Sequence, residues 1–230
     1  MPDEPATLAE GRYRGVLLDM DGTLIDSNEA HVKAWVEALL EAGYEVEEKR
    51  IWPFVGMGGD NLLPAAMGIQ KESAEGSRIS ERRGEIFKAR YLPDLRPFPG
   101  VRPLLERMRQ AGLRLVVASS SPADELETLL ALTGVEDLVD GTTSADEAGR
   151  SKPDPDVVRA ALEKIGLPES AVVMLGDTPY DVQAAAKAGV GVIALRCGGF
   201  PDKDLEGALA VYDGPADLLD RFAESPLGLG

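Results

Sequence analysis

The sequence predicts an α/β fold, in which a parallel sheet is flanked by helices and carries a small all-helical cap domain as an insertion. Three observations predict it. Short apolar runs recur along the 230 residues, amphipathic stretches separate most of them, and one long interval lacks any strand-like run. Alternation of strands and helices is typical of a parallel sheet, because parallel strands need a long crossover connection.

The predicted strands are short apolar runs, the pattern of strands that are covered on both faces. Several of them end in a polar residue. The set is YRGVLLD at 13–19, LRLVVAS at 113–119, LVDG at 138–141, AVVMLGD at 171–177, VGVIALR at 190–196 and ALAVYD at 208–213.

Helical periodicity predicts the connections between these strands. Three of the stretches close on a glycine, the residue that most often follows the end of a helix. They are VRPLLERMRQAG at 101–112, ADELETLLALTG at 123–134 and PDVVRAALEKIG at 155–166, and a last helix covers PADLLDRFAE at 215–224.

The interval between the first strand and the helix that opens at Pro99-Gly100 is far longer than one crossover needs. It contains helix-like segments at 30–43 and 76–92. We therefore expect residues 27–95 to form a helical cap domain on a core made of residues 1–26 and 96–230. Within the cap, the glycine-rich stretch 56–64 is expected to be a flexible loop facing the site. Residues 1–11 are expected to be a loose lead-in.

Charge excludes some classes of partner. The chain has 24 Lys and Arg against 40 Asp and Glu, a formal net charge of −16. Such a field repels nucleic acid and anionic membranes, so neither is an expected partner. No apolar stretch approaches the roughly 20 residues that cross a bilayer. With no signal-peptide pattern and a single cysteine, Cys197, a cytoplasmic location is expected. The oligomeric state, monomer or dimer, stays open.

Asp19, Ser119 and Asp177 stand where predicted strands end, and such positions meet at one edge of a parallel sheet. Asp21 follows Asp19 by two residues, so two carboxylates share the edge. A phosphate dianion ~4 Å from an ionised carboxylate is repelled by about 4 kcal/mol at an effective dielectric near 20. A site for phosphate would therefore need a cation, and Mg²⁺ suits carboxylate oxygens. Lys152 would supply a second, fixed positive charge.

Four segments together resemble, in order, the four motifs of haloacid dehalogenase-like phosphatases: DMDGT at 19–23, ASSSP at 118–122, SKPDPD at 151–156 and GDTPYD at 176–181. An insertion directly after the first motif resembles the helical-cap branch, which contains phosphoglycolate phosphatases and β-phosphoglucomutases. The resemblance implies a Rossmann-like core, Mg²⁺ as cofactor and a small phosphorylated metabolite as substrate.

By the same resemblance, Asp19 attacks phosphorus and ligates the metal. Asp21 acts as acid and base and lends its main-chain carbonyl to the metal. Lys152 links Asp19 to the phosphate. The other implied site residues are Thr23, Ser119, Ser120 and His31 around the substrate, and Asp177 and Asp181 as metal anchors, with Asp177 the more direct ligand.

Two alternatives to a phosphatase stay open. The segment around His31 also resembles the β-phosphoglucomutases, so a mutase is one alternative. At the position where the resemblance implies a phosphate-binding arginine in the mutases, however, this chain has Gly59. A non-catalytic binding module on the same fold is the second alternative, and the presence of Asp19, Asp21 and Lys152 argues against it. The basic cap residues Arg78, Arg82, Arg83, Lys88 and Arg90 are expected to form a solvated helix face.

Overall fold

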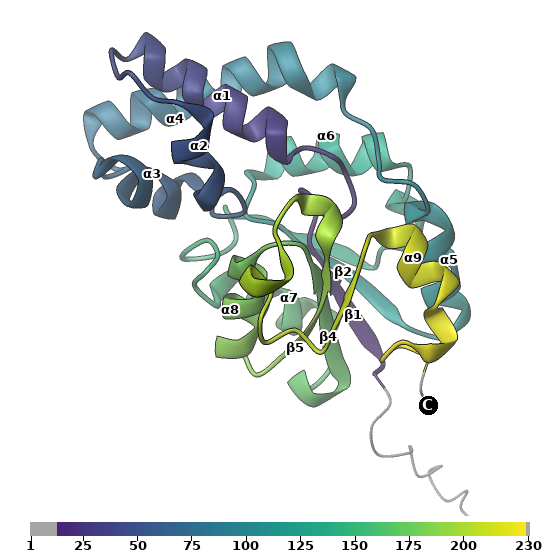
Figure 1. Ribbon diagram of the computed structural model, residues 1–230. Helices are drawn as coiled ribbons and strands as arrows, with labels where there is room; N and C mark the ends of the chain where they lie inside the picture. Colours follow the sequence, from purple (N-terminus) through teal and green to yellow (C-terminus); the bar gives the residue numbers. More distant parts are fainter. Residues whose placement is uncertain (1–12, 229–230) are drawn as a thin grey trace, which may run out of the picture.

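The computed structural model defines residues 13–228, so the predicted lead-in at residues 1–11 lies outside the described part of the chain. A single sheet forms its centre (Figure 1). The sheet is entirely parallel and has the order β3-β2-β1-β4-β5-β6. The strands are β1 (Gly15–Leu18), β2 (Arg114–Ala118), β3 (Gly141–Thr143), β4 (Val172–Gly176), β5 (Gly191–Leu195) and β6 (Ala210–Tyr212).

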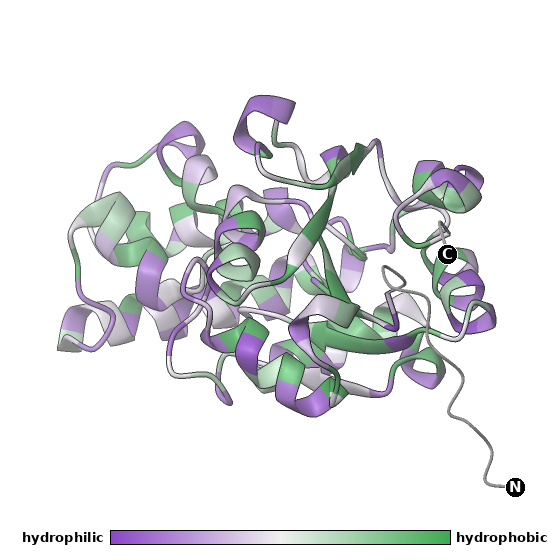
Figure 2. Ribbon diagram, turned by 90° about the horizontal axis from the view of Figure 1, so that it is seen from below, coloured by the Kyte–Doolittle hydropathy of each residue, from purple (hydrophilic) through white to green (hydrophobic). Residues whose placement is uncertain are grey.

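Helices cover both faces of the sheet, which explains why its strands are apolar on both sides. Leu17 and Met174 face α7 (Asp156–Ile165) and α8 (Pro179–Lys187) in one core cluster. Val16 and Leu18 face the opposite cluster, which includes α5 (Val101–Gln110), α6 (Ala123–Thr133) and α9 (Pro215–Asp220). Figure 2 shows the hydrophobic residues concentrated along the central strands. The prediction of an α/β fold with a parallel sheet is confirmed.

Glycines end the helices where the sequence predicts. Gly134 after α6 and Gly166 after α7 both have left-handed backbone, with φ of +64° and +66°. This conformation carries no Cβ penalty for glycine, and it stops the helix.

The predicted strand at 138–141 is displaced, because β3 begins only at Gly141. Residues Glu136–Leu138 form a helical turn instead. The carboxylate of Asp140 accepts the main-chain amide of Leu115 at 2.8 Å, so a side chain takes the place of a ladder hydrogen bond there.

The segment between β1 and α5 contributes no strand to the sheet, and we name residues 28–94 the helical insertion. Its helices are α1 (Asn28–Glu41), α2 (Glu48–Ile51), α3 (Gly59–Met67) and α4 (Ala74–Ile86), the last continued by a wider helical turn over Phe87–Tyr91. These helices lie together beyond the carboxyl ends of the strands (Figure 1). The expected flexible loop at 56–64 is wrong in part, because α3 begins at Gly59 and buries Leu62 and Leu63.

Two connections join the helical insertion to the core, and they run side by side. The amide of Asp26 donates to the carbonyl of Arg96 at 3.1 Å, and the amide of Phe98 donates to the carbonyl of Leu24 at 3.1 Å. The insertion therefore leaves and re-enters the core at one place, beside the end of β1. Among residues 13–228, no helix has the length and apolar character needed to span a bilayer.

Candidate active site

Three buried carboxylates meet at the carboxyl edge of the sheet. Asp19 follows β1, Asp177 follows β4, and Asp181 lies in the first turn of α8. An oxygen from each lies within 4.8 Å of the others. The topology explains the meeting: β1 and β4 are hydrogen-bonded neighbours with Leu18 opposite Leu175, so both chains leave the sheet at the same level. The next strand after β1 is β2 on one side of this pair, and the next strand after β4 is β5 on the other side. In open parallel sheets a crevice forms where the strand order reverses in this way.

Lys152 is the cation of this cluster. Its ammonium is buried, donates to Asp19 and lies 2.8 Å from Asp181. Burial alone would lower the pKa of Lys152, but Asp181 and Asp19 outweigh burial and raise it, so the lysine stays charged. Lys152 is therefore a buried, charged member of the cluster.

One lysine does not neutralise three buried carboxylates. Burial first, and then the charge of Asp181, raises the pKa of Asp19 to about 7, although Lys152 opposes this. Burial and the charges of Asp19 and Asp181 raise the pKa of Asp177 well above its ordinary range. Both shifts have one physical meaning: this pocket of low dielectric holds more negative charge than its own cation offsets.

Asp177 is held in place by one side chain from the turn after β1 and one from the start of the insertion. Its two oxygens accept the hydroxyl of Thr23 at 2.8 Å and the amide of Asn28 at 2.9 Å. The packing leaves no room beside it, because a Cβ on Gly22 would lie 2.2 Å from the Asp177 carboxylate. Gly22 also has a φ of +74°, which favours glycine. The turn after β1 and Asp177 are thus fitted to each other.

Asp181 is engaged on both of its oxygens. One accepts a hydrogen bond from the main-chain amide of Thr178 at 3.0 Å, and the hydroxyl of Thr178 accepts one from the main-chain amide of Asp181 at 3.2 Å, which forms a capping box at the start of α8. The other accepts Lys152. Asp181 therefore orients Lys152 and closes the helix end, whereas Asp177 accepts side-chain hydrogen bonds only from the neutral donors Thr23 and Asn28.

The donor set fits a hard divalent cation. Only carboxylate oxygens converge, and their excess negative charge is what a divalent ion would offset. Mg²⁺ is commonly bound by one or two carboxylates together with substrate oxygens and waters. Asp19 and Asp177 match this donor chemistry, and Asp181 stands behind them.

Asp21 lies apart from this cluster and has neutral or basic partners. It accepts hydrogen bonds from Ser27 at 2.6 Å and from Ser121 at 2.9 Å, and its carboxylate lies 2.7 Å from Nε2 of His31. Burial alone would raise the pKa of Asp21, but His31 and the two hydroxyls outweigh burial and hold this pKa well below its ordinary value. The two aspartates of the first motif therefore have their pKa values pushed in opposite directions by their surroundings.

His31 is oriented by Arg83 of α4. Because a guanidinium can only donate, its contact with Nδ1 leaves the imidazole hydrogen on Nε2, where it faces Asp21. Phe87 stacks on the imidazole with ring centroids 4.2 Å apart. Arg83 also donates to Glu125 of α6 at 3.0 Å, which links the insertion to the core. Its side chain is only 12% exposed, so the expectation of a solvated residue is wrong for Arg83, whereas it holds for Arg82 at 40%.

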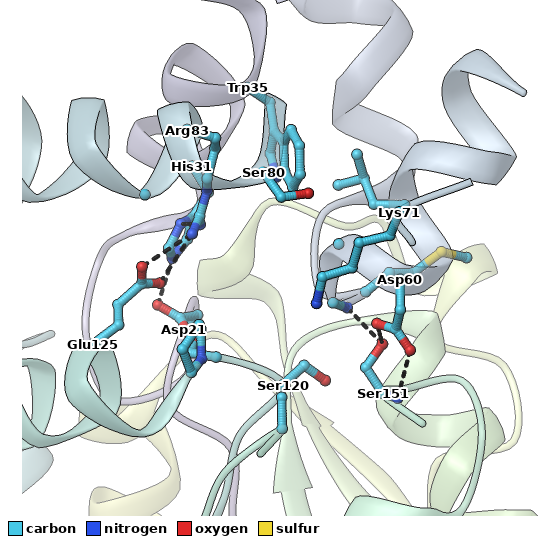
Figure 3. Close-up of a pocket in the computed structure, with 18 of the residues that line it drawn as sticks. Asp21, His31, Trp35, Asp60, Lys71, Ser80, Arg83, Ser120, Glu125 and Ser151 are labelled. Carbon is cyan, nitrogen blue, oxygen red and sulfur yellow. Dashed lines mark hydrogen bonds and ion pairs between the residues drawn. The ribbon is translucent and has the colours of Figure 1, made fainter. Parts of the chain in front are cut away.

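A cavity of about 730 Å³ lies between the core and the helical insertion. Its core wall includes Asp19, Asp21 and Ser120, and its other wall comes from α1, α3, α4 and the turn before α4 (Figure 3). This volume lies within the usual range of small-molecule sites.

The start of α3 contacts the core beside Lys152. The carboxylate of Asp60 accepts hydrogen bonds from the amide of Ser151 at 3.0 Å and from its hydroxyl (Figure 3). Asn61 donates to the carbonyl of Ser151 at 2.9 Å. Because Ser151 directly precedes Lys152, the insertion holds the backbone that positions this lysine. We name the contact of Asp60 and Asn61 with Ser151 the latch.

The structure brings most of the sequence-predicted residues together. Asp19, Lys152, Asp177 and Asp181 share one cluster. The side chain of Thr23 is on Asp177 rather than on the cavity wall. Ser119 is buried and accepts the amide of Ser121 at 3.0 Å, while Ser120 and Ser121 line the cavity.

Sequence reasoning missed Asn28, Ser121, Glu125, Asp60 and Asn61. Each contacts a residue far from it along the chain. Ser121 lies within the second motif, 118–122, and the other four lie outside the four motifs. Their pairing depends on how the helical insertion packs against the core, for which the sequence carries no local signal.

Comparisons with known proteins agree with this geometry. Residues 16–195 match the model of a family described as haloacid dehalogenase-like hydrolase. A phosphoglycolate phosphatase from Rhodospirillum rubrum is 31% identical over 90% of this chain and 90% of its own. An N-acetylmuramic acid 6-phosphate phosphatase from Pseudomonas aeruginosa is 28% identical over 91% of this chain and 94% of its own. The crystal structure of a hydrolase from Pseudomonas syringae superposes with a TM-score of 0.84 at 31% identity, covering 91% of this chain and 98% of the other.

Proposed function

The chain belongs to the haloacid dehalogenase-like hydrolase family, and on that premise we propose that it is a Mg²⁺-dependent phosphatase of a small phosphomonoester. The observation that carries the proposal is the buried cluster of Asp19, Lys152 and Asp177 beneath a cavity of small-molecule size. The similarity to phosphatases of phosphoglycolate and of a sugar phosphate supports the same class of substrate.

Asp19 is the proposed nucleophile. In the first step an oxygen of its carboxylate forms a bond to phosphorus, the bond from phosphorus to the leaving oxygen breaks, and Asp21 donates a proton to that oxygen. The products are an aspartyl-phosphate on Asp19 and the free alcohol. In the second step the oxygen of a water forms a bond to phosphorus, Asp21 accepts the proton of that water, the bond from phosphorus to the Asp19 oxygen breaks, and inorganic phosphate leaves. The proton taken from water is the one given to the next leaving group, so both aspartates are restored.

The lowered pKa of Asp21 describes the site without substrate. In that ionised state Asp21 is ready to accept the proton of water in the second step. A phosphoryl group beside it disfavours a second negative charge, which promotes protonation before the first step. The Nε2 hydrogen of His31 faces the same carboxylate and fixes its position.

Asp19, Asp177 and the main-chain carbonyl of Asp21 are the proposed metal ligands, with Asp181 behind them. When bound, Mg²⁺ would offset the negative charge of the carboxylates and of the phosphoryl oxygens. Lys152 contributes a fixed charge to the same oxygens. Ser119 and Ser120 are the proposed phosphate-binding residues at the end of β2.

The mutase alternative is disfavoured by the surroundings of Gly59. This position carries no cation, and a Cβ here would lie 3.2 Å from the Trp35 ring, a tight contact that requires the ring to shift slightly. A mutase must hold a second phosphate on its cap while the phosphoenzyme survives. We further propose that residues 27–95 act as a cap domain over the core, and that the protein is cytoplasmic, in keeping with its one unpaired cysteine, Cys197.

Phosphate release with and without Mg²⁺ tests the function. The panel is phosphoglycolate, hexose 1- and 6-phosphates and a nucleotide, and the variant is Asp19→Asn. We expect release to need Mg²⁺ and to be abolished in the variant, while the exposed control Asp213→Asn retains it. Isomerisation of a hexose 1-phosphate without release would support the mutase. The absence of turnover on every substrate would support the binding module.

A further inference from the structure

Four cationic side chains line the cavity, and three of them are neutralised. Arg83 is paired with Glu125 at 3.0 Å, Arg150 lies 3.6 Å from Asp154, and Lys88 pairs with Asp124. The fourth is Lys71, whose ammonium has no hydrogen-bond or ion-pair partner among residues 13–228. Lys71 is therefore the lining cation whose charge remains available to a ligand.

The main chain at Lys71 is held firmly, although the residue lies in a turn between α3 and α4. Its carbonyl accepts the hydroxyl of Ser77 at 3.0 Å, and the carbonyl of the preceding Gln70 accepts the hydroxyl of Ser73 at 2.6 Å. The turn also packs on Gly76, where a Cβ would lie 2.1 Å from the carbonyl oxygen of Gln70. From this fixed base the half-buried side chain extends into the cavity (Figure 3).

The position of this charge matters because the cavity is otherwise acidic. The aspartates and glutamates on its wall are Asp19, Asp21, Asp60, Glu72, Glu81, Glu85, Glu125 and Asp146. A substrate with a second anionic group would be repelled by this wall unless a cation met that group. Since Gly59 carries no charged side chain, the cation does not come from that position. Lys71 supplies it from a different element of the insertion.

We propose that Lys71 binds a second anionic group of the substrate, a carboxylate or another phosphate, distant from the phosphoryl group at Asp19. This inference rests on the proposed phosphatase function. It makes Lys71 a determinant of substrate specificity, acting on binding of the distal group and not on the transfer of the phosphoryl group.

Matched substrates separate the distal group from the chemistry. Phosphoglycolate and 2-hydroxyethyl phosphate share a two-carbon skeleton, but only the first has a carboxylate. Fructose 1,6-bisphosphate and fructose 1-phosphate differ in the same way by a second phosphate. The variant is Lys71→Met, which keeps the length and removes the charge. The control is Lys88→Met, which removes a lining cation that is already paired with Asp124.

A hydrogen bond to a charged group corresponds to a change of about 10- to 100-fold. We expect Lys71→Met to raise KM by this factor for one doubly anionic substrate, and to leave kcat, and kcat/KM on its singly anionic partner, within about twofold. The pair that responds identifies the distal group as carboxylate or phosphate. Lys88→Met should change neither.

Equal effects of Lys71→Met on both members of every pair would overturn the inference, because the lysine would then only balance the acidic wall. No effect on any pair would overturn it as well. In both cases the proposed phosphatase function is still supported if the wild type releases phosphate and Asp19→Asn does not. If the wild type releases phosphate from none of the substrates, the function and the inference fail together.

Discussion

Removal of the buried charge of Lys152 should destabilise the protein strongly. Its ammonium contacts Asp19 and Asp181, and all three side chains are at most 6% exposed. Substituting Lys152→Met leaves two carboxylates buried without their cation. Breaking a buried ion pair on one side costs about 3–5 kcal/mol, a large share of the roughly 5–15 kcal/mol that stabilises a typical domain.

The loss of folding stability in Lys152→Met should depend on pH. The pKa of Asp19 is about 7 in the folded protein against 3.8 ordinarily. A carboxylate whose folded pKa is raised contributes stability below pH 4, and this contribution is lost as the pH rises through 7. Lys152 opposes that shift, so its removal raises the pKa of Asp19 further. The destabilisation of Lys152→Met relative to the wild type is therefore expected to be larger at pH 8 than at pH 5.

Urea unfolding without divalent metal measures the effect. With a slope of about 3 kcal/mol per M, a loss of 3–5 kcal/mol lowers the midpoint by roughly 1 to 1.7 M. The control is Lys164→Met, which removes a half-exposed lysine paired with Glu147 at 2.7 Å. Such a surface pair is worth about 0–1 kcal/mol. A loss in Lys152→Met no greater than in the control, or equal at both pH values, would refute the reasoning.

Three further outcomes are expected. Mg²⁺ at 100 times its Kd should stabilise the protein by about 2.7 kcal/mol in thermal unfolding, more at pH 8 than at pH 5, and Asp177→Asn should diminish the gain; an equal gain in that variant would argue against Asp177 as a ligand. Asp60→Ala breaks the latch and should lower kcat/KM about tenfold, whereas unchanged kinetics would show that the latch does not position Lys152. Gly59→Arg should cost about 1–3 kcal/mol in urea unfolding because its Cβ meets Trp35, and NMR should detect no isomerised hexose phosphate.

Sequence by itself determined the fold class and the central cluster. The apolar runs predict the parallel sheet, and the glycines that follow α6 and α7 predict where these helices end. Both patterns can be recognised because they depend on residues close together in the sequence. Asp19 and Asp177 follow strands, and parallel strands end at one edge. Their meeting therefore follows from the strand pattern and the family resemblance together.

Tertiary structure alone decided the wall of the cavity. Arg83 sits in a run of basic residues that looks solvated in sequence, yet its guanidinium is buried between His31 and Glu125. Lys71 has the opposite character, since nothing in its local sequence separates it from any surface lysine. Which cation is neutralised and which is left without a partner on the cavity wall depends on contacts between the insertion and the core. Such contacts join residues that are tens of positions apart in the sequence, so local sequence patterns do not predict them.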